Sequence, residues 1–290
     1  MKIPRRNHTM KKIWITGAEG HIGSALINLL DCTEYHILAT DINEVDITDL
    51  EEVQQYMRVN RPDVVINCAS LTDVEYCATH RDEAYKVNAI GVRNIALAAN
   101  DVRAKVIQMS TDDVFDLESD IPYNEFDAVH PKTVYGKSKE AGEKFLTQLL
   151  NRFVIIRSSW IYGIGKDFVD EVLGNVGKLD VMKVPNNRYA VPTSAKELAK
   201  VVAYFIDHDA FGLYHVVCQG SCSRYEFAKA ILEYSGKADQ MELHPILSKD
   251  ELRPAYSVLD NMMMRLTGME EPKEWKAALK EYLDETGGIE

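Results

Sequence analysis

Tyr135 and Lys139 are the two side chains of this chain whose types and spacing most clearly suggest chemistry. They lie four residues apart, at the entry to a segment whose pattern predicts a helix over residues 138–150. Residues with this spacing share one helix face. A phenol ionises at about pH 10, and a neighbouring ammonium favours the phenolate. Such a tyrosine can transfer a proton near neutral pH, as carbonyl reduction requires. The spacing alone also fits two solvated helix residues.

Three glycines form a second group of this kind. Gly17, Gly20 and Gly23 come directly after a strand-like run and open a helical pattern. Glycines in this setting allow a tight turn, a close approach of backbone to a pyrophosphate, and close helix packing. The helix N-terminus offers free N–H groups to phosphates, so we expect His21 and Ile22 to contact a dinucleotide as well. The alternative is a glycine-rich turn that binds no ligand.

Asp41 ends the next strand-like run, 24 residues after Gly17. A carboxylate at this place can bind the ribose hydroxyls of an adenosine. Further acidic residues follow it, which disfavours a 2′-phosphate and favours NAD over NADP. Asp46 and Ile47 are expected to flank the adenine. The alternative for Asp41 is a solvated strand end.

Small and polar residues follow two later strands. Cys68, Ala69 and Ser70 end the third strand, where small side chains would let a cofactor lie against the backbone. Thr111 ends the fourth, and carboxyl ends of parallel strands line the ligand crevice. Its hydroxyl precedes Tyr135 by 24 residues and is expected to bond a substrate carbonyl. The residues that follow, Asp112 and Asp113, and two asparagines, Asn67 and Asn88, complete the set of candidates, although for Asn67 a buried side chain bonding the backbone is the preferred interpretation.

These residues need a framework of alternating strands and helices. The pattern predicts strands at 12–16, 36–40, 64–68, 105–110 and 153–157, and helices at 21–30, 50–59, 81–100 and 138–150. Such alternation predicts an α/β fold, a Rossmann-type doubly wound parallel sheet with helices on both faces.

The second half of the chain has shorter elements and predicts a smaller C-terminal α/β lobe for the substrate. A helix is expected at 193–207, a strand at 212–217, and helices at 224–235 and 274–285. We expect a disordered lead over 1–10 and a dinucleotide-binding domain over 11–160, to which a segment near 182–210 returns. The substrate-binding lobe then comprises 161–181 and 211–290.

Composition narrows the classes of function. The 290 residues are 46% hydrophobic and 27% charged, which suits one large or two unequal globular domains. A net charge of −12 without a basic cluster argues against nucleic acid or an anionic membrane as partner. No apolar run approaches the roughly 18 residues of a membrane span. The five scattered cysteines, with no secretory signal, indicate reduced thiols in the cytoplasm, and the spacing of Cys218 and Cys222 does not predict a metal site.

Together the motifs resemble the extended short-chain dehydrogenase/reductase superfamily, and within it the dTDP-4-dehydrorhamnose reductase family. The resemblance extends over nearly the whole chain from Met10. The stretches that carry it include Ser110-Thr111-Asp112-x-Val114-Phe115, Val134-Tyr135-Gly136-Lys137-Ser138-Lys139, Arg157-Ser158-Ser159-Trp160-Ile161-Tyr162-Gly163 and Arg253-Pro254-Ala255-Tyr256-Ser257-Val258-Leu259-Asp260.

The resemblance implies reduction of the 4-keto group of a dTDP-linked 6-deoxyhexose, giving dTDP-L-rhamnose, with NADPH or NADH as hydride donor. Tyr135 would protonate the developing alkoxide, and Thr111 would hold the oxygen. Lys139 would bond the nicotinamide ribose and keep the tyrosine acidic. Trp160 and Arg253 would fall in the nucleotide-sugar site. The alternatives are a core aromatic for Trp160 and a surface ion pair for Arg253. The oligomeric state stays open, with a homodimer as one possibility.

Departures from the family pattern put the sugar in doubt. The family usually has tyrosine where this chain has Asp113 and tryptophan where it has Arg224. A reductase of another nucleotide-linked keto-sugar is therefore one alternative. A second is a non-catalytic NADP-binding subunit similar to the regulatory subunit of methionine adenosyltransferase, although Thr111, Tyr135 and Lys139 favour an enzyme.

Overall fold

Within residues 10–116, 119–249 and 255–287, which the computed structural model describes, six strands form one parallel sheet. They are β1 (Lys11–Thr16), β2 (Tyr35–Thr40), β3 (Val64–Asn67), β4 (Lys105–Thr111), β5 (Phe153–Ser158) and β10 (Gly212–His215). The spatial order is β10-β5-β4-β3-β1-β2. The chain thus leaves β1 towards one side of the sheet and returns to β3 on the other, which creates a topological switch point between these two strands.

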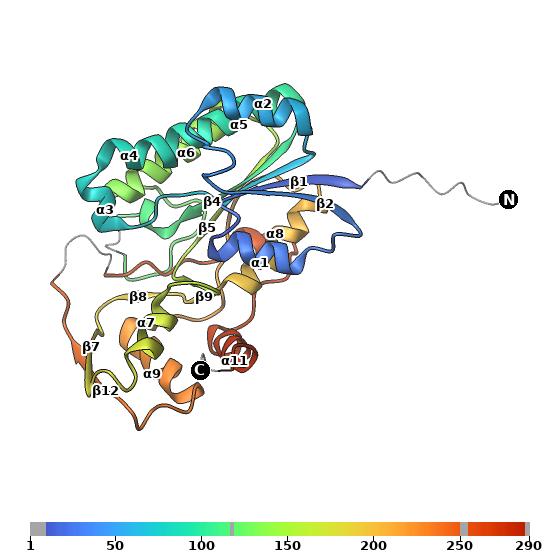
Figure 1. Cartoon of the computed structure of the whole chain (residues 1–290). Helices are drawn as coiled ribbons and strands as arrows, with labels where there is room; N and C mark the ends of the chain where they lie inside the picture. The colour runs from blue at the N-terminus through green and yellow to red at the C-terminus, as the bar shows by residue number, and fades with distance from the viewer. Residues whose placement is uncertain (1–9, 117–118, 250–254, 288–290) are drawn as a thin grey trace.

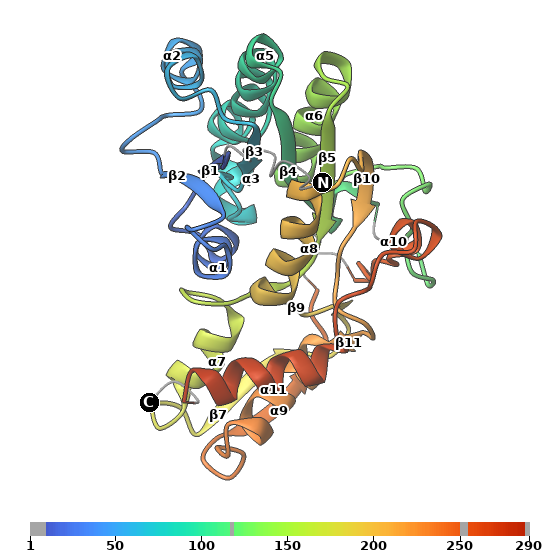
Figure 2. The same ribbon diagram turned by 90° about the vertical axis from the view of Figure 1, so that its right-hand side faces the viewer.

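Helices cover both faces of this sheet (Figures 1 and 2). Alternate side chains of a strand point to opposite faces. Ile13 and Ile15 of β1 pack in one core with α1 (His21–Leu29) and α8 (Ala195–Asp207). Trp14, between them, packs in another core with helices of the opposite face. The helices of that second face are α2 (Leu50–Asn60), α5 (Val92–Val102) and α6 (Val134–Leu149). The predicted doubly wound α/β fold is confirmed.

One predicted helix differs in its interior. The pattern predicted a single helix over 81–100, after the short α3 (Val74–Thr79). The structure has α4 (Arg81–Tyr85), then a π-helical turn η1 (Lys86–Gly91), then α5. Isolated π turns within α-helices are frequently found at functional sites. Here the π turn carries Asn88, one of the candidate site residues, so the α-helix is interrupted at a residue expected near the cofactor.

A smaller lobe lies beyond the carboxyl ends of the strands, with its own hydrophobic core around Phe227, Trp275 and Leu279. Three helices build it, α7 (Phe168–Asn175), α9 (Arg224–Tyr234) and α11 (Trp275–Glu285). Short strand pairs complete it: β6 (Ile161–Tyr162) with β9 (Thr193–Ser194), β7 (Val181–Pro185) with β12 (Glu242–Ile246), and β8 (Tyr189–Ala190) with β11 (Cys222–Ser223).

Two segments pair differently from the division into sheet domain and lobe that was expected from the sequence. Strand β10 pairs with β5 in the central sheet, whereas residue 211 onwards was assigned to the lobe. Conversely, β7 and β8 pair with lobe strands, although they begin the segment near 182–210 that was expected to return to the sheet. From that segment, α8 and Ala210 pack against the core below the sheet. The assignment of these strands to the sheet or to the lobe depends on the strands they pair with, which lie far away in the sequence. Local periodicity gives no information about such pairing.

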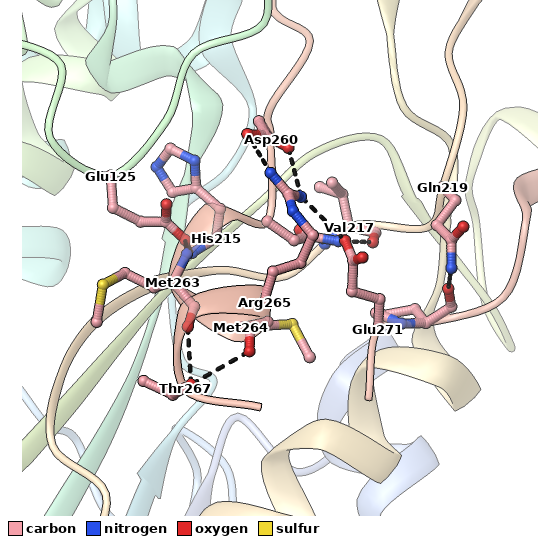
Figure 3. A network of polar contacts seen from close by, with 12 residues as sticks. Glu125, His215, Val217, Gln219, Asp260, Met263, Met264, Arg265, Thr267 and Glu271 are labelled. Carbon is pink, nitrogen blue, oxygen red and sulfur yellow. Dashed lines mark hydrogen bonds and ion pairs between the residues drawn. The ribbon is translucent and has the colours of Figure 1, made fainter. Parts of the chain in front are cut away.

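A polar network fastens the segment after residue 255 to the edge of the sheet (Figure 3). Glu125 accepts hydrogen bonds from the backbone N–H of His215 in β10 (2.8 Å) and of Met263 in α10 (Met262–Leu266; 3.1 Å). Arg265 of α10 forms an ion pair with Asp260 at 2.7 Å. Burial, and then the charge of Arg157, lower the pKa of His215 to about 3. The ring is therefore neutral in the folded protein.

In the described part of the chain, no helix is long and apolar enough to cross a membrane.

Candidate active site at the switch point

The glycine loop after β1 has the geometry that a pyrophosphate requires. Gly17 has a φ of +63°, in the left-handed region that favours glycine. A Cβ on it would lie 2.6 Å from the backbone N of Ala69, so no other residue fits there. Gly20 is the N-cap of α1 and has no side chain to satisfy the first N–H groups. The loop therefore fits a dinucleotide, with the helix N-terminus directed to its phosphates.

The other residues predicted in this loop contribute backbone more than side chain. A Cβ on Gly23 would lie 2.4 Å from Gly17 O, so the third glycine allows α1 to pack on the loop. Ile22 packs against the core below α1. His21 directs its ring across to the lobe, with Nδ1 2.9 Å from Ile164 O. What remains for a ligand is the set of N–H groups of the first helical turn.

Asp41 lies beside the glycine loop. Its Oδ2 accepts a hydrogen bond from Glu19 N at 3.1 Å, and Glu44 Oε2 accepts one from Asp41 N at 2.8 Å. Two carboxylates thus converge at the end of β2. Asp46 accepts a hydrogen bond from Thr48 N at 2.8 Å, within the turn before α2. Ile47 is buried, in the core with α5, so its contact with an adenine stays a prediction.

Asn88 joins the loop after β3 to helix α6. Its Oδ1 accepts hydrogen bonds from Ser70 Oγ and from Leu71 N, each at 2.9 Å. Its Nδ2 donates to Leu71 O and to Ser138 Oγ, again at 2.9 Å. The side chain therefore bonds both backbone and side chains. It ties Ser70 and Leu71, which follow Cys68 and Ala69 in the loop, to the helix that carries Tyr135 and Lys139.

Asn67, by contrast, is part of the sheet. It accepts a hydrogen bond from Thr16 Oγ1 at 2.6 Å and donates one to Gln108 Oε1 at 2.7 Å. Asn67 is buried, as the preferred interpretation expected. Its printed hydrogen bonds differ from that interpretation, because they join it to side chains of the neighbouring strands and not to the backbone. This buried chain of polar groups ties β1, β3 and β4 together below the site.

Tyr135 and Lys139 occupy the first two turns of α6, which begins four residues before the predicted start. Thr133 is its N-cap and accepts a hydrogen bond from Gly136 N at 2.8 Å. Lys139 is almost fully buried and donates to Met109 O at 2.8 Å and to Ser70 Oγ at 3.2 Å. Burial lowers the pKa of Lys139 to about 8. The ammonium is thus aimed at the loop after β3.

The turn after β4 brings Thr111 to Tyr135. Thr111 caps the 3₁₀ turn η2 (Asp112–Val114) by accepting a hydrogen bond from Asp113 N at 3.2 Å. A Cβ on Gly136 would lie 2.0 Å from Asp113 O, so this turn packs directly on α6. Burial and the Asp113 carboxylate raise the pKa of Tyr135, and a hydrogen bond with Thr111 opposes them. The sequence suggested an acidified phenol, whereas the structure has a phenol that holds its proton.

The lobe contributes aromatic and cationic groups. Trp160 has a φ of +39°, a strained conformation for a bulky residue. Arg224, at the start of α9, places its guanidinium carbon 4.0 Å from the ring centroid of Trp160 and 4.3 Å from that of Phe168. Burial raises the pKa of Asp112, and Arg224 is among the groups that oppose this shift. Phe168 carried no signal in the sequence. Arg253 lies outside the described residues.

The structure thus brings Thr111, Tyr135 and Lys139 together beside the glycine loop, with Asp112 and Asp113 behind the tyrosine. Among the residues that the structure describes, no group of three or more His, Cys, Asp or Glu could hold a metal ion. The assembly can bind a dinucleotide on one side and present a proton donor on the other.

Comparison with known proteins identifies the family to which the chain belongs. The family model of the RmlD substrate binding domain matches residues 10–287. The spore coat polysaccharide biosynthesis protein SpsK of Bacillus subtilis is 36% identical over 281 residues, covering 95% of this chain and 98% of its own. A solved dTDP-4-dehydrorhamnose reductase from Clostridium acetobutylicum is 40% identical with a TM-score of 0.92, covering 95% of this chain and 99% of its own.

A second solved structure is the dTDP-4-dehydrorhamnose reductase of Bacillus anthracis in complex with NADP. It is 35% identical with a TM-score of 0.93 and covers 96% of this chain and 100% of its own. The match thus extends over both the sheet and the lobe. The chain belongs to the RmlD substrate binding domain family, the dTDP-4-dehydrorhamnose reductase branch of the extended short-chain dehydrogenases/reductases.

Proposed function

We propose that this protein reduces the 4-keto group of a nucleotide-linked 6-deoxyhexose with NADPH or NADH, with dTDP-4-dehydro-L-rhamnose as substrate and dTDP-L-rhamnose as product. The observation that carries the proposal is the convergence of Thr111, Tyr135 and Lys139 at the switch point, next to a loop that fits a dinucleotide. The names of the relatives support it, because the two solved structures are dTDP-4-dehydrorhamnose reductases.

In this proposal Tyr135 is the general acid. A reduced nicotinamide, when bound, supplies the hydride to C4. Tyr135 gives its proton to the developing alkoxide, and the Thr111 hydroxyl donates a hydrogen bond to the same oxygen. The raised pKa of Tyr135 supports this role, because the phenol keeps its proton until negative charge develops on the substrate.

Lys139 holds the cofactor side of the site. Its ammonium points to Ser70 at the end of the loop after β3, where the nicotinamide ribose would lie. A buried cation there donates hydrogen bonds to ribose hydroxyls and favours negative charge on Tyr135 once the proton has left. Gly17 and Gly20 leave room for the pyrophosphate, and Gly23 allows α1 to pack closely on the loop.

The acidic end of β2 bears on the choice of cofactor. Asp41 and Glu44 lie together beside the loop, and a 2′-phosphate would add negative charge to this place. This favours NADH. The Bacillus anthracis relative was solved with NADP, so both cofactors belong in the proposal.

A second candidate substrate is a different nucleotide-linked keto-sugar. The observation that favours it is the pair of opposite charges next to the catalytic centre, with Asp113 buried beside Tyr135 and Arg224 stacked on Trp160. Charged groups can accept and donate hydrogen bonds to sugar hydroxyls that a tyrosine and a tryptophan would bond differently. A homodimer and a cytoplasmic location stay predictions.

The proposal is tested by following the oxidation of NADPH and of NADH in the presence of a panel of nucleotide-linked 4-keto-sugars. We expect turnover with dTDP-4-dehydro-L-rhamnose. Turnover only with another sugar would select the second candidate. Oxidation with none of the sugars would overturn the enzymatic proposal in favour of a cofactor-binding partner protein, which gel filtration with methionine adenosyltransferase would then examine.

A further inference from the structure

Glu143 lies on the same face of α6 as Tyr135 and Lys139, because the three residues follow one another at intervals of four. It is buried, with only 7% of its surface exposed. A carboxylate in such a place loses its hydration and needs compensating partners. The proton transfer and cofactor binding described above make no use of Glu143, although it stands one helical turn from Lys139.

Two strands hold this carboxylate in place. Ser110 of β4 donates a hydrogen bond from Oγ to Glu143 Oε1 at 2.5 Å. Arg157 of β5 donates from Nε to Oε1 at 2.9 Å and from Nη2 to Oε2 at 2.6 Å. A guanidinium that grips both oxygens in this way is the strongest geometry for an ion pair. The carboxylate is therefore held in one orientation, as a member of a buried ion pair.

Lys139 needs a negative charge near it. Its two hydrogen-bond acceptors, Met109 O and Ser70 Oγ, are neutral. Burial lowers its pKa to about 8, and the groups that oppose this shift are Glu143 first and then Cys68. Burial in turn raises the pKa of Cys68 to about 12, so this thiol carries no charge at neutral pH. Glu143, ion-paired with Arg157, is then the group that opposes the loss of the Lys139 proton.

Arg157 limits that effect. It forms an ion pair with the Glu143 carboxylate, so part of the negative charge of Glu143 is already compensated from the side of β5. The neighbouring ring of His215 is neutral, since its pKa is lowered to about 3. Tyr135, on the other side of Lys139, keeps its proton. The Glu143 carboxylate therefore pairs directly with one buried cation, Arg157, and acts electrostatically on a second, Lys139.

We propose that Glu143, held by Arg157, is a positioning residue that keeps Lys139 protonated in the site and so sets the highest pH at which the protein binds its nicotinamide cofactor and reduces its substrate. The inference rests on the proposed function, because it takes Lys139 as the group that bonds the cofactor ribose. It adds a charge pair on two further elements, β5 and the second half of α6, to the machinery.

The two partners predict opposite changes. Lys139 is charged below its pKa, so cofactor affinity and kcat/KM should fall as the pH rises through about 8. Glu143→Gln removes the opposing charge and should move this alkaline limb to lower pH by roughly one unit. Arg157→Gln removes the compensating cation and should move it to higher pH. Damage to the fold would lower both quantities in each variant without moving the limb in opposite directions.

The experiment measures the Kd of NADH and of NADPH by protein fluorescence, and kcat/KM for the sugar, across neutral and alkaline pH. Glu140→Gln is the matched control, because it removes the same charge from the same helix, where Glu140 pairs with exposed Lys144 at 2.6 Å. It should leave the limb unchanged. Glu143→Asp should restore most of the wild-type profile. If Glu143→Gln fails to fold, the double variant Glu143→Gln/Arg157→Gln removes both members of the buried ion pair, so that neither charge is left without the other, and its limb should still lie below that of the wild type.

Opposite shifts in the two single variants, or a lower limb in the double variant, support the proposal. Unchanged limbs, shifts in the same direction, or an equal shift in Glu140→Gln would overturn it. Failure of the proposed function gives a different result, because cofactor affinity would keep the predicted pH dependence while no sugar is reduced.

Discussion

Burial changes the acid–base properties of the side chains at the centre of the site. The Tyr135 phenol is held protonated by burial and by Asp113, while burial brings the Lys139 ammonium close to neutrality at a pKa of about 8. A proton donor next to an ammonium that must stay charged suits a reduction near neutral pH. In the proposed function Tyr135 and Lys139 supply the chemistry, and the charges around them then set the pH range of turnover.

Tyr135→Phe removes the proton donor and little else. We expect kcat to fall by about 10²- to 10⁴-fold, the usual contribution of a general acid, while the Kd of NADH changes by only a few-fold. Stopped or steady-state assays of cofactor oxidation, with fluorescence titration for affinity, measure both. Tyr204→Phe, at a half-exposed position on α8, is the control and should be unaffected. An active Tyr135→Phe enzyme would remove the general-acid assignment.

Arg224→Leu removes the guanidinium stacked between Trp160 and Phe168. Hydrogen bonds from charged groups contribute about 1.5–3 kcal/mol, so kcat/KM for the nucleotide sugar should fall by roughly tenfold or more. The KM of the cofactor should not change, because Arg224 belongs to the lobe. Lys229→Leu, which removes an exposed cation from the same helix, is the control. Equal losses in both variants would mean that Arg224 has no specific contact with the sugar.

Some elements approach each other so closely that the position between them must be glycine. The turn η2 packs its backbone on the first turn of α6 at Gly136, and this contact sets the distance between Thr111 and Tyr135. The π turn η1 places Asn88 where it can bond both the loop after β3 and Ser138. The precision of the site therefore comes from contacts between elements.

Gly136→Ala tests this contact. Its Cβ would lie 2.0 Å from Asp113 O, so the turn must move away from α6. We expect a destabilisation of about 1–3 kcal/mol, typical of overpacking, and a larger loss in kcat than in cofactor affinity. Denaturant unfolding and steady-state kinetics measure these effects.

Gly174 in α7 provides the matched control, since a Cβ there meets nothing within 4 Å. Gly174→Ala should stabilise the protein by roughly 0.5–1 kcal/mol through helix propensity and leave kcat unchanged. A Gly136→Ala variant that behaves in the same way would contradict the close packing of η2 on α6.

Contacts between segments far apart in sequence hold the sheet and the C-terminal segment together. The network around Glu125 and His215 joins the edge strand β10 to α10 (Figure 3). His215 is neutral when folded, because burial holds its pKa at about 3, compared with an ordinary value of 6.5. In the unfolded chain the ring can take up a proton below that ordinary value.

The pH dependence of stability follows from this difference. Between about pH 6.5 and pH 3 the unfolded state binds the proton and the folded state does not, so this residue lowers stability as the pH falls through that range. His215→Gln cannot titrate, and its free energy of unfolding should decrease less steeply with acid than that of the wild type. Urea unfolding at a series of pH values measures the slopes. Parallel slopes would show that His215 is protonated in the folded protein.

Much of the fold could be read from the sequence because it depends on local patterns. β-Branched runs alternating with helical periodicity predicted the sheet strands β1 to β5 and the helices around them. The helix over 81–100 was predicted as continuous, since helical periodicity does not distinguish the π turn at Lys86–Gly91 from the α-helices on either side of it. The short lobe strands were missed because each has only two to five residues and a partner far along the chain.

The sequence by itself determined the types and order of the groups that the proposed function uses: a glycine loop after the first strand, Thr111 at the end of the fourth, and Tyr135 four residues before Lys139. Spacing along one strand or helix is enough to establish these. The tertiary structure alone decided their protonation and neighbours. The buried environment that keeps the proton on Tyr135 and the ion pair of Glu143 with Arg157 arise from segments that meet only in the folded chain. Burial and charge act through space, so they cannot be read from the separation of residues along the sequence.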